Sequence, residues 1–498
     1  MGIVKKQAYK NTIVAYTGMV VAYLNTVLLF PQIIGNEQYG FYNLVISVSV
    51  LYSLIASMGV PSILAKFFPF YRTADKTHNG LIHWAAGLAF LAFVGATVVY
   101  ILFKPMVVAA YANNSPLFVH YYYYIIPLAF FVIAFNFLEM SGRIVYQTIY
   151  SNILQNVVLR LLTTVLLVLM AKKWIDFNEF ILLYIGSNGL ISLLLLIRLF
   201  LSGEYSHRLH DTSFKAIKKR EILLFGTFTL VSSAIYVLLQ KVDTLMLSAM
   251  AGDAVQGVYT WYFNIAMVIS VPAQALSRTT YAIVADSWKT KNMANISEVY
   301  YKTSIVQMLI GCLLFIGIFI NRDNLFAIVN NKDFTDPKYF NLFLVIGLGF
   351  LFDITGGLNT YIITTSHKYR LMTLFVLVAS IFCISLNYVL IPLYKGLGAA
   401  ISYMLTIGLL NFGSWFYIKY RFKMQPFTNK HLLVIVIATA SYFAGHYVWK
   451  MPNVFVDIFV RSMITTIVYG TLTYILRISE DVNDKVDHTI SRFLKRHH

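Results

Sequence analysis

Apolar residues follow one another in long runs that are separated by short polar connections. A helix that crosses the hydrocarbon core of a bilayer needs about 20 mainly apolar residues. Runs of that length predict fourteen membrane-spanning helices, at residues 11–34, 42–68, 81–103, 117–140, 148–171, 175–201, 222–249, 257–283, 301–320, 339–365, 370–391, 396–418, 431–449 and 456–476. The predicted fold is therefore an all-α polytopic membrane protein.

The composition supports this fold and excludes most soluble classes. Of the 498 residues, 58% are hydrophobic and only 12% are charged, which is too few to coat the surfaces of soluble domains. The longest connections, about 202–221 and 321–338, are too short to fold a catalytic domain with its own core. Cys312 and Cys383 lie inside apolar runs and indicate neither a disulfide nor a metal site. We therefore expect no enzyme activity, no cofactor and no metal.

The formal charge of +18 is explained by membrane topology. Lys and Arg lie between the apolar runs and do not gather on one face or tail, as a nucleic-acid-binding surface would require. Of the 39 basic residues, 27 fall in one set of alternate connections, 8 in the other set and 4 within spans. Because Lys and Arg accumulate in cytoplasmic connections, both termini are predicted to be cytoplasmic.

A short sequence pattern occurs twice and predicts two related halves. Residues 35–42 and 252–259 share G-x4-G-x-Y at an offset of 217, although three identities could also arise by chance. Each half holds an even number of spans, so both insert in the same orientation. We predict an N-terminal six-helix lobe (1–201), a basic cytoplasmic linker (202–221), a C-terminal six-helix lobe (222–425), two additional helices (426–476) and a cytoplasmic amphipathic tail (477–498).

Four segments resemble the polysaccharide-transporter branch of the multidrug/oligosaccharidyl-lipid/polysaccharide exporter (MOP) superfamily, the Wzx-type flippases. They are Leu28-Leu-Phe-Pro-Gln-Ile-Ile-Gly-Asn-Glu-Gln-Tyr-Gly-Phe-Tyr42, Met58-Gly-Val-Pro-Ser62, Val242-Asp-Thr-Leu-Met-Leu247 and Ile391-Pro-Leu-Tyr-Lys-Gly-Leu-Gly-Ala-Ala400. With the span count and the repeat, they cover nearly the whole chain.

The resemblance implies a central cavity that opens alternately to each side of the bacterial inner membrane. It implies a cargo of undecaprenyl-diphosphate-linked oligosaccharide, moved to the periplasmic leaflet for surface polysaccharide or O-antigen biosynthesis. Membrane lipids and other polysaccharide-assembly proteins are the expected partners, and nucleic acid is not. A cation-coupled multidrug exporter of the same fold is the main alternative. A membrane glycan polymerase or ligase would need a larger outer loop than this chain has.

Charged residues inside spans are costly and therefore identify candidate binding positions. Arg160 lies about 15 Å into its span, which predicts either a cavity-facing cation or the partner of a carboxylate on a neighbouring helix. Lys241 is a second candidate for the cavity. Lys66 and Arg278 follow Pro61 and Pro272 near the inner ends of equivalent helices, where they would meet an entering diphosphate or extend to the lipid headgroups.

Asp243 and Asp353 are the candidates for proton or Na⁺ coupling. Lys241 and Asp243 are two residues apart and point about 200° apart on a helix, so they cannot pair face to face. Asp243 could equally serve helix packing, and Asp353 could form a salt bridge to Arg160 or Lys241.

Overall fold

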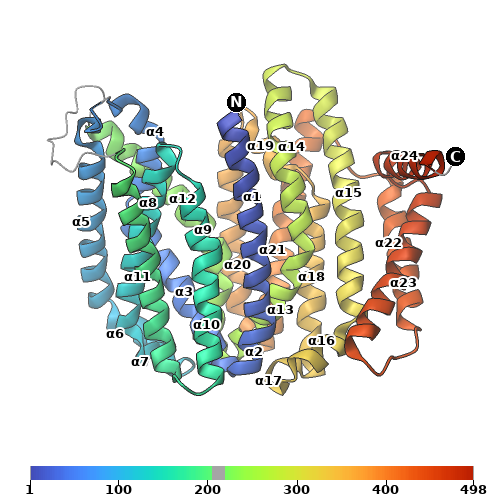
Figure 1. Cartoon of the computed structure of the whole chain (residues 1–498), viewed down its shortest axis with the longest axis horizontal. Helices are drawn as coiled ribbons and strands as arrows, with labels where there is room; N and C mark the ends of the chain where they lie inside the picture. The colour runs from blue at the N-terminus through green and yellow to red at the C-terminus, as the bar shows by residue number, and fades with distance from the viewer. Residues whose placement is uncertain (1, 74, 205–218, 497–498) are drawn as a thin grey trace. The chain divides into compact units, whose positions relative to one another are not determined.

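The computed structural model describes residues 2–73, 75–204 and 219–496, which form helices and no strand (Figure 1). Packing divides the chain into two compact units, Met1–Thr260 and Trp261–His498, named unit 1 and unit 2 below. The sequence placed the division at 202–221 instead. α12 (Lys219–Ala251) accounts for the difference, because it packs against α3 and α4 of unit 1. The lobe boundaries derived from the span count stay a prediction.

Unit 1 contains two π-helical segments within its helices, and these are the features that shape its interior. Before α12, its elements are α1 (Gly2–Tyr23), η1 (Leu24–Leu29), α2 (Phe30–Ile33), α3 (Asn36–Ala56), α4 (Val60–Tyr71), η2 (His78–Gly80), α5 (Leu81–Leu102), α6 (Lys104–Tyr111), α7 (Pro116–His120), η3 (Tyr122–Tyr124), α8 (Ile125–Ile144), α9 (Ile149–Ile153), η4 (Leu154–Val158), α10 (Leu159–Ala171) and α11 (Phe177–Leu201). The π-helical segments are η1 and η4.

α13 (Asp253–Met267) begins in unit 1 and ends in unit 2. Unit 2 continues with η5 (Val268–Ser270), α14 (Val271–Lys289), α15 (Met293–Ile320), α16 (Arg322–Val329), α17 (Lys332–Thr335), η6 (Pro337–Tyr339), α18 (Phe340–Thr355), α19 (Asn359–Thr365), α20 (Arg370–Tyr394), α21 (Gly396–Tyr417), η7 (Ile418–Phe422), α22 (Asn429–His446), α23 (Val454–Ile475) and α24 (Glu480–Arg496).

Thirteen helices of the described chain are long and apolar enough to cross a membrane, which confirms the polytopic fold. The thirteenth predicted span, 431–449, corresponds to α22, which begins with Asn429-Lys430-His431 and does not reach this standard. α22 nevertheless lies along α23 and α15, so it packs as a member of the bundle in unit 2.

Several predicted spans are interrupted in the structure, and in two of them the next helix has a proline in its first turn. The run 42–68 divides at Met58 and Gly59, which both have positive φ, and Pro61 then lies in the first turn of α4. The run 257–283 divides at η5, and Pro272 lies in the first turn of α14. Because proline fits the first turn of a helix, these two prolines start new segments after a break.

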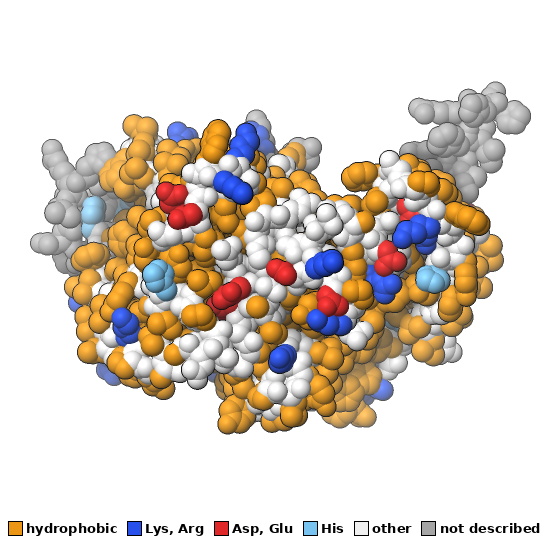
Figure 2. All heavy atoms as spheres, turned by 90° about the horizontal axis from the view of Figure 1, so that it is seen from below, with side chains coloured by type: hydrophobic (Ala, Val, Ile, Leu, Met, Phe, Trp, Pro, Cys, Tyr) orange, Lys and Arg blue, Asp and Glu red, His pale blue; other side chains and the backbone are white. Residues whose placement is uncertain are grey.

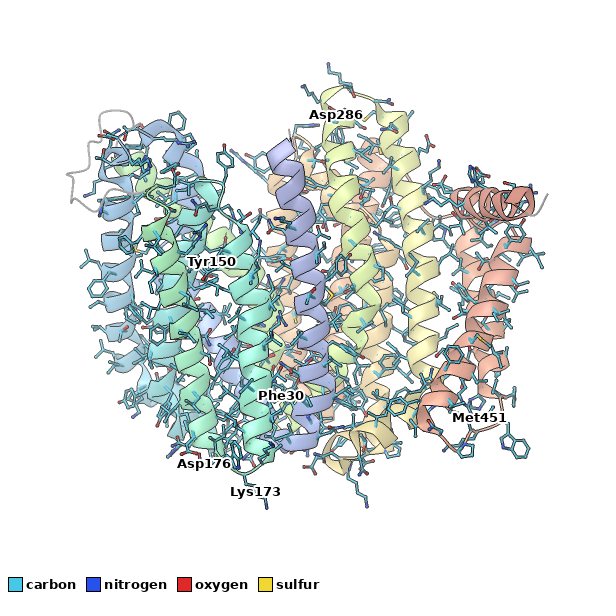
Figure 3. All side chains as sticks on the ribbon, viewed as in Figure 1. Phe30, Tyr150, Lys173, Asp176, Asp286 and Met451 are labelled. Atoms are coloured by element: carbon cyan, nitrogen blue, oxygen red, sulfur yellow. The ribbon has the colours of Figure 1, made fainter. Side chains whose placement is uncertain are left out.

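The ends of the helices carry the charges, as expected of a membrane bundle. Figure 2, which views one end, shows acidic and basic side chains interspersed there, with hydrophobic side chains around them. In unit 1, Lys173 and Asp176 lie at one end while Tyr150 lies toward the other; in unit 2, Asp286 and Met451 lie at opposite ends (Figure 3). These positions agree with the predicted alternation of connections within each unit.

Candidate functional site

The two G-x4-G-x-Y segments pack against each other within unit 1. A Cβ built on Gly40 would lie 1.9 Å from the carbonyl oxygen of Asp253, and one built on Gly257 would lie 2.0 Å from the carbonyl oxygen of Asn36. Asn36 and Asp253 are equivalent positions, since each follows the first glycine of its segment. The contact is therefore reciprocal, which supports a true internal repeat. Only glycine lets the two backbones approach this closely.

The tyrosines that end the two segments have different partners. The Tyr259 hydroxyl donates a hydrogen bond of 3.1 Å to Oδ2 of Asp243, which is 8% exposed on α12. The Tyr42 ring lies edge-on against Tyr184 of α11, with 5.1 Å between the ring centroids. Asp243 thus joins α12 to α13, as the packing alternative expected, and its role in ion coupling stays a hypothesis.

Arg160 is a half-buried cation in the interior of unit 1. It lies in α10, two residues after the π-helical segment η4, and its guanidinium interacts electrostatically with the hydroxyls of Tyr42 and Tyr184. Its Nε atom is buried and has no hydrogen-bond partner. No salt bridge to Arg160 occurs among the described residues of unit 1. An unsatisfied guanidinium donor inside a membrane bundle is the kind of group that binds an anion.

The backbone around Arg160 is fixed by a polar contact between two π-helical helices. Asn25, 3% exposed in η1, donates to the Arg160 carbonyl oxygen at 2.9 Å and accepts from Thr164 Oγ1 at 2.8 Å. Gly18 lies against the backbone of Asn156 in η4, where a Cβ would come within 2.2 Å of the carbonyl oxygen. π-helical segments often occur at functional sites because the extra residue redirects the side chains that follow.

The other predicted cations lie in different settings. Lys241 is half-buried in α12, two residues from the buried Asp243. Lys66 is exposed, and its Nζ atom lies 3.9 Å from the ring centroid of Phe225, so it forms a cation–π contact on the surface of α4 and α12. Arg278 belongs to α14, but its side chain lies outside the described residues.

Asp353 belongs to a polar network inside unit 2. Its Oδ1 atom accepts a hydrogen bond of 3.0 Å from the Asn411 amide, and Asn359 donates in turn to Asn411 Oδ1 at 3.2 Å. The Tyr300 hydroxyl donates to Asn359, which completes a chain of contacts from α18 to α15. Asp353 itself is exposed at the surface of the unit. A carboxylate and two amides are oxygen-bearing groups suited to a proton or a small cation.

The network forms where a predicted span is broken. α18 ends at Thr355 and α19 begins at Asn359, and Gly357 between them has a φ of +62°. A Cβ on Gly356 would lie 2.3 Å from Asn411 Oδ1, so glycine is needed for the amide to approach. Breaks in membrane helices are stable only when neighbouring groups satisfy the freed backbone.

Unit 2 also contains a groove of about 950 Å³ between α15, α18, α21 and α22. Its wall is almost entirely apolar and includes exposed side chains from α18, α21 and α22, such as Phe352, Phe412 and Leu432, so the groove is open to the surface of the unit. The polar residues that line it are few: Thr355, Asn359, Asn411, His431 and Thr439. The groove therefore meets the Asp353 network through Asn359 and Asn411.

Sequence reasoning missed the uncharged members of both clusters. The prediction of binding positions rested on charged residues alone. It therefore left out three amides within spans: Asn25, Asn359 and Asn411. Amides that interrupt apolar runs were the available signal, because a buried amide must find partners. Among the described residues, no three His, Cys, Asp or Glu side chains gather as a metal site.

Comparison with known proteins identifies the family. A family model described as polysaccharide biosynthesis protein matches residues 4–284, more than half of the chain, and a second model, MatE, matches residues 229–390. No curated protein matches the sequence significantly.

Solved structures share the fold at low sequence identity. The lipid II flippase MurJ, in an inward closed conformation, superimposes with a TM-score of 0.73 at 12% identity, covering 94% of this chain and 98% of that chain. An inward-facing multidrug resistance MATE family transporter of the MOP superfamily gives a TM-score of 0.63 at 14% identity, covering 82% of this chain and 94% of that chain. At these identities the likeness shows the fold.

The likeness to MurJ includes the C-terminal helix pair. The 6% of this chain outside that match amounts to about 30 residues, whereas α22 and α23 together run from Asn429 to Ile475. Part of this pair must therefore superimpose on MurJ. Both structural relatives are transporters or flippases. The chain belongs to the polysaccharide biosynthesis protein family, and it shares its fold with the MurJ flippase and with a transporter of the MOP superfamily.

Proposed function

We propose that the protein flips undecaprenyl-diphosphate-linked oligosaccharides from the cytoplasmic to the periplasmic leaflet by alternating access. The groove of unit 2 is the observation that carries this proposal. Its volume of about 950 Å³ lies at the upper end of the range for small-molecule sites, which is roughly 300–1,000 Å³. This groove is apolar along most of its wall, which suits a hydrocarbon chain.

The open side of the groove matters for a lipid cargo. A polyprenyl chain gains little free energy by moving from lipid tails to an apolar wall, because both surroundings are equally apolar. The groove would therefore guide the chain without trapping it. The polar groups at Asn359, Asn411 and His431 mark the part of the groove where the polyprenyl chain would end and its headgroup would begin.

Arg160 supports the assignment of an anionic headgroup. Guanidinium groups bind phosphate oxygens through paired, charge-assisted hydrogen bonds, and the buried Nε atom of Arg160 is available for one. The hydroxyls of Tyr42 and Tyr184 are further polar groups that interact with this guanidinium. Lys241 and Lys66 in unit 1 and Arg278 in unit 2 stay proposed contacts of the headgroup, each within its own unit.

We further propose an inner-membrane location with both termini cytoplasmic, and coupling to a proton or Na⁺ gradient through Asp353 or Asp243. Flipping that depends on a gradient should become independent of it in Asp353→Asn or Asp243→Asn. Unchanged gradient dependence in both variants would reject this coupling assignment while leaving the cargo open.

The cargo is tested with purified protein in liposomes and a fluorescent undecaprenyl-diphosphate oligosaccharide, whose accessibility to a quencher reports flipping. We expect wild type to flip the lipid and the Arg160→Ala, Lys241→Ala double variant to lose most of the activity. Arg143→Ala is the matched control, since Arg143 is exposed and paired with Glu139. Equal loss in the control, or full activity in the double variant, would contradict the cationic headgroup site.

A drug exporter is the second candidate, and the MatE match over residues 229–390 favours it. The same liposomes decide between the two functions. Uptake of a cationic dye without flipping of the lipid would replace the flippase assignment.

A further inference from the structure

Asp253 is a buried carboxyl group in the junction formed by Gly35–Tyr42 and Gly252–Tyr259, and none of the proposed transport steps uses it. It is 1% exposed and is the first residue of α13. The Ser115 hydroxyl next to α7 donates a hydrogen bond to Oδ2. The other carboxyl oxygen, Oδ1, is buried without a hydrogen bond of good geometry.

The polar atoms around this carboxyl group do not compensate for its burial. Ser248, fully buried at the end of α12, lies beside it, but the Ser248 hydroxyl also has no well-formed hydrogen bond. One turn along α13, Oε1 of the fully buried Gln256 is likewise without a partner. Oδ1 of Asp253 and Oε1 of Gln256 are therefore two buried acceptor atoms without a well-formed hydrogen bond, and the Ser248 hydroxyl lies beside Asp253 as a donor.

The charged and titratable groups that face Asp253 add no positive charge. Glu37, exposed at the start of α3, is close enough to repel an ionised Asp253. Tyr111 at the end of α6 is the other titratable neighbour, and burial together with the Asp253 charge raises the pKa of its hydroxyl. Ser115 and Ser248 are the remaining polar neighbours, from the α7 and α12 sides.

Two opposing effects decide the charge of Asp253. The N-terminus of α13 favours an anion, but this effect is modest and falls off within the first turn. Burial of a carboxylate whose only partners are serine hydroxyls, with no cation beside it, is far more costly. The closed junction therefore favours the neutral carboxylic acid, and an open, hydrated junction favours the carboxylate.

We propose that Asp253 is a proton-binding site that latches the junction between the two repeat segments. The bound proton sits on the carboxyl oxygen that lacks a donor, and the carboxyl can then itself donate a hydrogen bond to one of the neighbouring oxygens. Closing the junction takes up one proton and opening releases it. Since the closed form binds more protons, its population falls as the pH rises. The latch is independent of the cargo, so it can be tested without a transport assay.

Hydrogen exchange measures the latch directly. The first amides of a helix lack intrahelical acceptors, so the amides at the starts of α3 and α13 are protected mainly by the closed junction. Protection factors of residues 36–42 and 253–259 should be measured in lipid nanodiscs at pH 5 and pH 8, after correction for intrinsic exchange. The amides of α8 provide the internal reference. We expect protection at pH 5 to exceed that at pH 8 by about tenfold in wild type.

Variants assign the effect to a residue. Asp253→Asn, a neutral isostere, should keep the high protection at both pH values, and Glu37→Gln, the exposed acid in the same junction, should keep the wild-type pH dependence. If Asp253→Asn does not fold, Asp253→Ala serves in its place. The protection of residues 36–42 and 253–259 in Asp253→Ala should be the same at pH 5 and pH 8, even if it is lower than in wild type. Equal protection of wild type at both pH values would overturn the proposal. So would pH dependence that survives in the Asp253 variants or disappears in Glu37→Gln.

Discussion

The side-chain amide of Asn25 donates a hydrogen bond to the backbone carbonyl of Arg160 over 2.9 Å, and so joins the first helix of unit 1 to the span that carries its buried cation. The bond connects two spans that each contain a π-helical segment: η1 follows α1, and η4 precedes α10. The position of the guanidinium therefore depends on a residue 135 positions earlier in the chain.

Replacing Asn25 with Ala should destabilise unit 1 by about 1–3 kcal/mol, because the Thr164 hydroxyl and the Arg160 carbonyl lose a buried partner. Flipping activity should fall as well, since the backbone of Arg160 is no longer held. Thermal unfolding in detergent and the liposome assay measure the two effects. Asn113→Ala, at an exposed position, is the control; a variant as stable as this control would show that the bond contributes little.

Gly40→Ala and Gly257→Ala should each force the repeat segments apart. The added Cβ would overlap a backbone carbonyl, and overpacking of this kind typically costs about 1–3 kcal/mol. Both variants should lower hydrogen-exchange protection at residues 36–42 and 253–259 together, because each glycine faces the other segment. Gly87→Ala on α5, with nothing within 4 Å of its Cβ, should leave protection unchanged. Loss confined to the mutated segment would contradict the reciprocal contact.

Filling the groove should impair lipid flipping without unfolding unit 2. Gly408 lines the groove, and a Cβ there has nothing within 4 Å, so Gly408→Leu projects a side chain into open space. Flipping of the undecaprenyl lipid should drop several-fold, because the leucine side chain occupies part of the apolar volume that the polyprenyl chain would use. Gly413→Leu on the same helix is matched, since Gly413 is equally unobstructed and is not in the lining. Equal activities of the two variants would remove the groove from the lipid path.

Arg461 should be among the most important side chains for the stability of the C-terminal helix pair. Its Nε atom lies 2.7 Å from Asp457 Oδ2, and its other nitrogens donate to the carbonyl oxygens of Gly445, His446 and Val448. Arg461→Ala leaves Asp457 buried and without its cation, which costs about 3–5 kcal/mol in comparable pairs.

Limited proteolysis of the connection between α22 and α23 reports the effect of Arg461→Ala. Arg322→Ala is the control, because its ion pair with Asp323 is exposed. Equal resistance of the two variants to the protease would show that Arg461 does not hold the connection.

The spans could be predicted from the sequence because about 20 consecutive apolar residues have few other uses. The breaks could not, since Gly59 and Gly357 look like other helical glycines until their positive φ is seen. The paired motif predicted a repeat, but its reciprocal contact depends on helix packing. Lys66 illustrates the limit for the site: its place after Pro61 suggested contact with an entering diphosphate or with lipid headgroups, whereas its cation–π contact depends on Phe225, 159 positions away in the chain.

The opening of the groove at the surface of unit 2 has a consequence for the energetics of transport. A chain that stays in contact with the bilayer throughout does not have to be extracted from it, so each isoprene unit adds almost nothing to the barrier. The barrier is then set by the diphosphate and its sugars. A transporter built this way should accept carriers of different chain length at similar rates, and its selectivity should lie in the polar head.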